Sequence, residues 1–172
     1  MEEVRSSFQV GAALAWILMT ATGVGGCGSP SGPSPKTALS LVRLRSDSQS
    51  FLTFSGYDQP QTVVVRDGDT WQRIWNEVHR RTTPIPPLVE VDFAREIVVM
   101  AAQGSQPSSG FEILFTSASE ADGAATVEVE AQTPGPRCIT LTVMTSPLDL
   151  ARIPTRSGTV FFRTRPTVVN CL

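Results

Sequence analysis

Short apolar segments, separated by turn-forming residues at intervals of about ten residues, run through most of this chain and constrain its fold most strongly. They are residues 39–45, 51–54, 62–65, 97–101, 110–115, 125–131, 139–144 and 159–163. Each is short for a helix, so we predict a strand for each. Val127 and Val129 alternate with Glu128 and Glu130, which predicts that this strand has one face toward solvent.

One segment, residues 69–80, has a helical period instead. Its apolar residues recur at the spacing of one helix face: Trp71, Ile74, Trp75 and Val78. Asp69 is the expected N-cap, with Gln72 completing a capping box, and the prolines that follow Thr82 end the helix. Many short strands with one amphipathic helix near the start predict an α+β domain that is mainly antiparallel β, compact and sheet- or sandwich-like.

The N-terminal segment is typical of a secretory signal. Arg5 precedes an uncharged apolar run over residues 10–19, and small residues then lead to Cys27. This run is shorter than the roughly 20 apolar residues that span a bilayer, which disfavours a stop-transfer anchor. Val24-Gly25-Gly26-Cys27 resembles a bacterial lipobox, and the resemblance implies that Cys27 is lipidated and becomes the mature N-terminus. An ordinary signal peptide with an incidental cysteine is the alternative.

The chain therefore divides into three parts. We expect a lipoprotein signal peptide at 1–26, the lipidated cysteine with a Gly/Ser/Pro tether at 27–37, and a single β-rich domain at 38–172. The Gly/Ser/Pro run cannot bury apolar surface, so it should be a solvated spacer. This organisation predicts an exported protein anchored to a membrane by its lipid, on the periplasmic or the cell-surface face.

The chain has three cysteines. If Cys27 carries lipid, Cys138 and Cys171 are left, and an even remainder in an exported protein predicts one disulfide. Loop entropy suggests that this bridge contributes about 3–4 kcal/mol of stability and holds the C-terminus. Two free buried thiols are the alternative.

Residues that could carry catalysis are few. His79 is the single histidine, and it lies in the last turn of the predicted helix, where the helix dipole favours a cation. No Gly-x-Ser-x-Gly motif accompanies it. Three carboxylate pairs could serve a glycosidase, but each also has a structural interpretation. They are Asp67 with Asp69, Glu90 with Asp92, and Glu128 with Glu130.

We therefore predict a protein without catalytic residues, metal site or cofactor; an exported hydrolase is a competing interpretation. The formal net charge is −2 and 17% of residues are charged, which argues against a nucleic-acid partner.

The loop over residues 104–111 is the strongest candidate for a partner contact. It is small and polar, it is bounded by glycines, and it ends in an aromatic residue that could anchor an interface. The candidate contact residues are Gly104, Pro107, Ser108, Ser109, Gly110 and Phe111. The alternative is a plain hairpin loop with Phe111 in the core.

Several motifs in order resemble the C-terminal domain of the PrcB family of protease-complex lipoproteins. They are Val91 to Met100, Gly104-x-x-Pro-x-x-Gly-Phe-x-Ile113, Thr133-Pro-Gly-Pro136, Thr145-Ser-Pro147 and Ile153-Pro154. The helix with its two tryptophans fits as well, so the resemblance covers about residues 62–163. It implies a small, largely β, non-catalytic domain on a surface lipoprotein, which binds a secreted protease or another envelope protein.

The candidate partner loop departs from that family pattern. The family loop typically reads Pro-Thr-Gly-Gly-Tyr, whereas this chain has Pro107-Ser-Ser-Gly-Phe111. The same run also resembles the Pro-Thr-Thr-Gly-Phe/Tyr loop of chagasin-like inhibitors of cysteine proteases. A protease inhibitor that uses residues 104–111 is therefore a second functional hypothesis.

Overall fold

The computed structural model describes residues 34–44, 53–155 and 158–171. The predicted signal peptide, Cys27 and most of the tether lie outside these residues. The elements that follow in chain order are β1 (Thr37–Leu39), β2 (Val42–Arg43), β3 (Gln61–Val65), α1 (Gly68–Val78), β4 (Ile97–Ala102), β5 (Glu112–Ala121), β6 (Ala124–Pro134), β7 (Leu148–Ile153) and β8 (Thr159–Val169).

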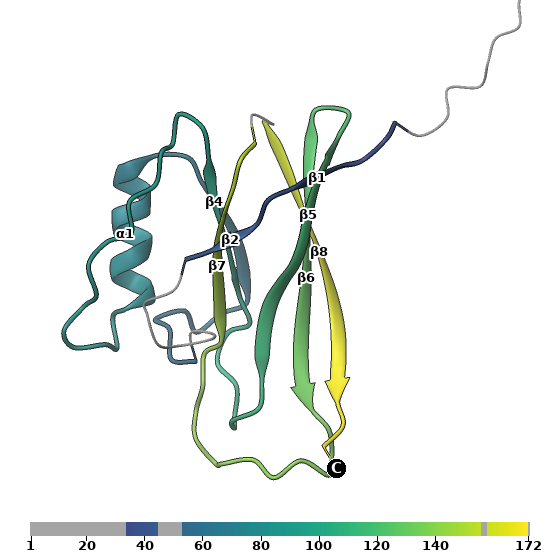
Figure 1. The fold of residues 1–172 in the computed structure, drawn as a ribbon. Coiled ribbons are helices and arrows are strands. Elements are labelled where there is room, and N and C mark those ends of the chain that lie inside the picture. Colours follow the sequence, from purple (N-terminus) through teal and green to yellow (C-terminus); the bar gives the residue numbers. More distant parts are fainter. Residues whose placement is uncertain (1–33, 45–52, 156–157, 172) are drawn as a thin grey trace, which may run out of the picture. The chain divides into compact units, whose positions relative to one another are not determined.

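The strands of the described residues form two four-stranded sheets (Figure 1). Sheet A has the order β1-β5-β6-β8, and sheet B has the order β2-β7-β4-β3. Neighbours are antiparallel except for β6 and β8, which pair in parallel over their whole length. The fold is thus mainly antiparallel β in a sandwich-like arrangement with one short helix, which confirms the predicted fold class.

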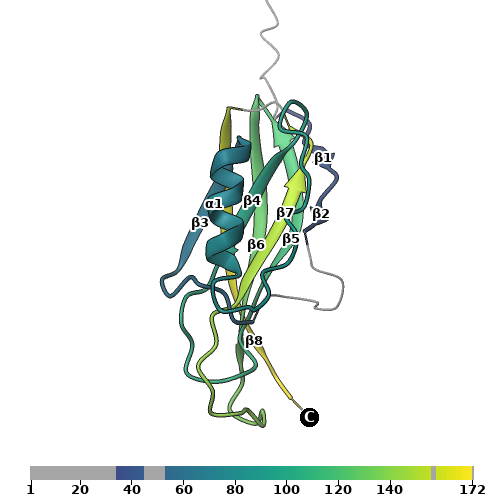
Figure 2. The same cartoon turned by 90° about the vertical axis from the view of Figure 1, so that its left-hand side faces the viewer.

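Strand β4 lies at the centre of the packing because all six of its residues are buried. Ile97, Val99 and Ala101 face an inter-sheet core, and the alternate residues face a second core beneath α1. A strand covered on both faces loses the apolar–polar alternation and becomes a continuous apolar run. Helix α1 lies along the face of sheet B in Figure 2, so the molecule has three layers: helix, sheet B and sheet A.

The helix buries the face that its sequence predicts, while its N-cap differs from the prediction. The four apolar residues Trp71, Ile74, Trp75 and Val78 are all buried. Asp67 is the N-cap: its carboxylate accepts a hydrogen bond from the Thr70 amide at 2.8 Å, which holds the Asp67 pKa below its usual value. The predicted capping box is therefore wrong, because Asp69 lies within the first turn and the Gln72 side chain bonds Asn76.

Two strand assignments near the end of the domain also differ from the prediction. Residues 139–144 form no strand although their apolar residues alternate. Strand β7, which was not predicted, pairs with β4 over its whole length and with β2 at Ala151 and Arg152. The predicted strand at 39–45 divides into β1 and β2, which join different sheets. Of the predicted strand at 51–54, residues 51–52 lie outside the described residues and Phe54 forms an isolated bridge with Ser146.

An ion pair within sheet B, between Arg43 of β2 and the buried carboxylate of Asp149, links this sheet to the backbone of sheet A. Asp149 of β7 is 3% exposed, and its Oδ2 accepts hydrogen bonds from Arg43 Nε at 3.0 Å and from the Phe115 amide at 2.9 Å. Arg43 also donates to the Phe115 carbonyl at 2.6 Å. Because the register of β5 shifts between Phe115 and Ser117, this bulge leaves backbone groups that the ion pair satisfies.

In the part of the chain that the structure describes, no helix has the length and apolar character needed to cross a membrane.

Candidate interaction surface

Three loops meet where the strands of both sheets end, at the lower end of the molecule in Figure 1. They are residues 53–60, 103–111 and 135–147, and we call this region the loop end. It receives the end of β4 and the beginnings of β3, β5 and β7, and α1 also ends there. The candidate partner loop is therefore one part of a larger surface.

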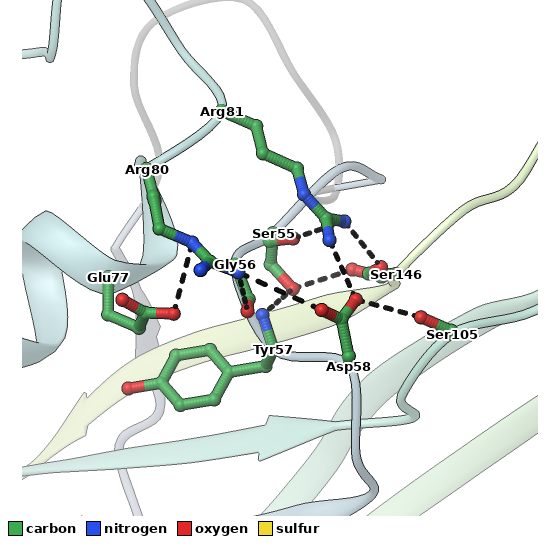
Figure 3. Close-up of polar contacts among 9 residues, drawn as sticks. All are labelled: Ser55, Gly56, Tyr57, Asp58, Glu77, Arg80, Arg81, Ser105 and Ser146. Carbon is green, nitrogen blue, oxygen red and sulfur yellow. Dashed lines mark hydrogen bonds and ion pairs between the residues drawn. The ribbon is translucent and has the colours of Figure 1, made fainter.

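A polar network centred on Asp58 and Arg81 connects these three loops (Figure 3). Arg81, just after α1, donates to the Asp58 carboxylate at 2.7 Å and to the Ser55 carbonyl and the Ser146 hydroxyl, both at 3.0 Å. The Ser105 hydroxyl donates to the same Asp58 oxygen at 2.8 Å. The network thus joins the helix to all three loops, because each contributes at least one of these residues.

These contacts give a pH-dependent prediction for Asp58. The hydrogen bond from Arg81, followed by that from Ser105, holds the pKa of Asp58 below its ordinary value. A lowered pKa in the folded state means that the stabilising contact is fully present above the ordinary pKa and is lost as the pH falls through the lowered one. NMR titration of the Asp58 carboxyl carbon should show the low pKa in the unaltered protein. Arg81→Gln should raise it, and an unchanged value would contradict the network.

The candidate partner loop is hydrogen-bonded to residues 141–145. Gln106 and Thr145 exchange two backbone hydrogen bonds of 2.7 and 3.0 Å. The Ser109 amide donates to the Leu141 carbonyl at 3.0 Å, and the Ser109 hydroxyl accepts from the Leu141 amide at 2.8 Å. The Thr145 hydroxyl donates to the Ser108 carbonyl at 3.0 Å. These polar groups of the loop are thus used within the protein.

The remaining residues of the loop shape its path. Pro107 is exposed and Phe111 is half-buried. The exposure of Phe111 is thus intermediate between an interface anchor on the surface and a residue of the core, which were the two interpretations of the sequence. Gly104 and Gly110 adopt positive φ angles of 78° and 92°, a conformation that residues with a Cβ rarely adopt. A Cβ on Gly104 would also lie 2.8 Å from Pro60 Cδ and 2.9 Å from its backbone nitrogen.

Gly104→Ala should therefore destabilise the domain more than a matched substitution of a glycine in open space. Gly123 has a similar φ of 72° but nothing within 4 Å of a built Cβ. Gly123→Ala should cost about 1–2 kcal/mol for the left-handed conformation alone. Gly104→Ala should lose that amount and more in urea unfolding, because the loop must also move away from Pro60. Equal losses for the two variants would contradict the close packing.

The most exposed apolar residues lie on the third loop rather than on the candidate partner loop. Residues 138–144, which we call the apolar segment, include Ile139 at 100% exposed, Leu141 at 70% and Met144 at 64%, together with exposed Val143. Exposed Phe54 lies next to this segment, since Phe54 bridges Ser146. Large apolar side chains gathered in one exposed region are typical of interaction sites.

The predicted disulfide is present and closes the apolar segment at its start. Cys138 and Cys171 are bonded, with their Cα atoms 4.9 Å apart. The Gly135 amide also donates to the Val169 carbonyl at 2.9 Å, so the loop is joined to the end of β8 by both a covalent and a hydrogen bond. The C-terminal strand is thereby held against the loop end.

The candidate catalytic residues do not form one group: Glu128 and Glu130 line one open pocket, and Glu90 and Asp92 line another. His79 is buried as the C-cap of α1, where its ring lies 4.2 Å from that of Trp75 and its Nδ1 lies 2.9 Å from the Trp75 carbonyl. Asp92 accepts from the Ala94 amide, and Glu128 and Glu130 lie in register with Arg163 and Arg165 of β8. Among the described residues, no group of three or more His, Cys, Asp or Glu side chains could hold a metal ion.

Residues 97–154 match the family model of the PrcB C-terminal domain. This confirms the resemblance stated from the motifs. The matched region is shorter than residues 62–163, and the helix with its two tryptophans lies outside it. No curated protein and no solved structure matches the chain.

The PrcB C-terminal match includes the parts of the fold that build the loop end. It contains β4, β5, β6 and β7, which are the two central strands of each sheet. It also contains the candidate partner loop and the apolar segment. Sequence reasoning missed the apolar segment because it interpreted residues 139–144 as a strand. The uncharged run from Cys138 to Leu148, which follows the proline-containing turn at 133–136, was the available signal.

Proposed function

We propose that this chain is an exported lipoprotein whose domain serves as a non-catalytic partner of a secreted protease. The observation that carries the proposal is the PrcB C-terminal match over residues 97–154, because the PrcB resemblance implies association with a protease complex. The exposed apolar residues at the loop end support it, since a domain with this role needs a surface for a partner.

The position at which the chain joins the domain supports the lipid anchor. Ser34 donates a hydrogen bond to Asp122 at 2.5 Å, and Thr37 of β1 pairs with Glu120 of β5. Both contacts lie at the turn between β5 and β6, which is the end of the sheet opposite the loop end (Figure 1). The chain thus enters the domain at the end opposite the loop end, as a tether from an N-terminal anchor would.

Inhibition through residues 104–111 receives less support. An inhibitory loop presents its polar backbone groups to the enzyme, whereas Gln106, Ser108 and Ser109 use theirs to bond residues 141–145. A supporting role and an inhibitory role also predict opposite effects when the protein is removed, so one experiment separates them.

That experiment compares secreted protease activity in cells that have the gene and in cells that lack it. We expect the activity of one protease to fall on deletion and to return when the full-length chain is supplied again. A rise in activity would favour inhibition, and unchanged activity of every secreted protease would contradict the proposed function. A hydrolase would be revealed by turnover from the purified chain alone.

The anchor has a separate test. Intact-protein mass spectrometry of the mature chain should find diacylglycerol on Cys27 as the first residue. Cys27→Ser should release the domain from the membrane fraction without changing its unfolding. Cleavage at another position, or an unmodified cysteine, would contradict lipidation.

A further inference from the structure

We propose that the apolar segment, residues 138–144, inserts into an uncharged, apolar cleft of the protein partner, and that the loop 104–110 serves as its support. This inference rests on the proposed function, because it specifies how the partner is bound. The loop 104–110, which the sequence indicated as the partner contact, then supports the apolar segment and is not itself the main contact.

The first argument is the shape and exposure of the segment. Ile139 is fully exposed, and Leu141 and Met144 have about two thirds of their surface in water. The segment lies in the long connection at the far end of the sandwich in Figure 1, so these side chains are displayed on a projecting loop. A projecting apolar loop fits a concave apolar site, in which central anchoring side chains contribute most of the binding energy.

The second argument is that the segment is held in place before any partner binds. Its start is fixed by the disulfide from Cys138 to Cys171. Its middle is fixed by the two hydrogen bonds between Leu141 and Ser109, and Thr145 beyond its end bonds Gln106 and Ser108. Because ordering a loop on binding costs free energy, a segment fixed in advance binds more tightly than a free one.

The third argument concerns the chemistry of the occupant. From Cys138 to Leu148 the chain has no charged residue, so its binding site needs no compensating charges. An anionic membrane surface would instead attract a cluster of unpaired basic residues, whereas Arg80 and Arg81 at this end of the molecule are paired with Asp58, and Arg137 is the basic residue that precedes the segment. A protein cleft lined by apolar side chains therefore suits the segment better than a lipid surface.

The test places the photo-crosslinking residue p-benzoyl-L-phenylalanine at position 141 of the full-length lipoprotein in its own cells. Position 161 serves as the matched control, since Phe161 is also apolar and 54% exposed but lies on the outer edge strand β8. We expect an adduct with a protease from position 141, at peptides that line an uncharged cleft, and none from position 161. Lipid adducts, adducts with a second copy of this chain, or no adduct from position 141 would each overturn the inference.

The identity of the adduct separates the inference from the proposed function. An adduct between position 141 and the cleft of a protein that is not a protease would keep the inference and contradict the proposed function. A protease linked through position 161 and not through position 141 would keep the proposed function and contradict the inference.

Substitutions give an independent measurement on the captured partner. Leu141→Ser should weaken its affinity about tenfold or more, whereas Leu141→Met and Phe161→Ser should leave it nearly unchanged. The thermal unfolding of each variant should match that of the unaltered chain, since Leu141 and Phe161 are exposed. Equal affinities for the Leu141→Ser and Phe161→Ser variants would overturn the inference.

Discussion

Asp149→Ala should destabilise the domain by about 3 kcal/mol, the lower end of the range typical of breaking a buried ion pair, because Asp149 is buried whereas Arg43 is 32% exposed. The substitution removes the acceptor of Arg43 and of the Phe115 amide, so it leaves two donors between the sheets without their partner. Because small domains have a total stability of about 5–15 kcal/mol, the variant should unfold at a much lower urea concentration.

A more exposed ion pair provides the control for Asp149. Arg152 bonds Glu96 at 3.3 Å, and both side chains are partly exposed at 36% and 22%. Glu96→Ala should therefore cost less than about 1 kcal/mol. Should Asp149→Ala fail to fold, Asp149→Asn would retain the volume and one acceptor oxygen, and its urea unfolding could be measured. A loss for Asp149→Ala no larger than that for Glu96→Ala would show that the pair does not join the sheets.

Trp75→Ala should destabilise the domain by about 3–5 kcal/mol through the loss of a large buried side chain. Trp75 is 1% exposed, and its ring contacts those of Trp71 and His79. Its indole N–H also donates to the Pro86 carbonyl at 2.9 Å, while that of Trp71 donates to Val89. These two bonds fasten residues 82–93 across the helix, so the variant should also be cut more readily there by an added protease.

Trp75→Phe separates the packing of this residue from its hydrogen bond. The phenyl ring fills much of the space but cannot donate to Pro86, so we expect part of the loss together with increased cleavage in residues 82–93. Ile85→Ala is the control for an exposed side chain on the same segment and should change stability by less than about 0.5 kcal/mol. Stability and cleavage that stay unchanged in both Trp75 variants would contradict this account of the segment.

The parts of the fold that could be predicted are those determined by neighbouring residues or by a simple count of residues. The buried face of the helix could be predicted because Trp71, Ile74, Trp75 and Val78 recur at the spacing that places them on one side of a helix. The disulfide between Cys138 and Cys171 was predicted by counting cysteines, since the assignment of Cys27 to lipid left a single pair.

The parts that could not be predicted depend on contacts between distant residues. Strand β7 was missed because Asp149 and Arg152 interrupt its apolar pattern. The reason Asp149 can be buried is Arg43, which lies 106 positions away in the sequence. Residues 139–144 have the alternation of a strand, but an alternating pattern does not show whether another strand will pair with it.

The candidate site shows the same division. Glycine and serine composition located the loop 104–111 correctly, and Gly104 and Gly110 do adopt the left-handed conformation. Composition could not reveal that Ser108 and Ser109 bond residues 141–145, which makes this loop a support for the apolar segment. The apolar segment was identified by the exposure of its side chains, which depends on the fold and cannot be read from composition.

The most direct test of the central claim is affinity purification of the full-length lipoprotein from its own envelope after extraction with a mild detergent, followed by quantitative mass spectrometry. Our account predicts that one secreted protease is recovered in near-equal molar amount, well above its level with an unrelated lipoprotein as control. Recovery of no protease above that control level would contradict the account.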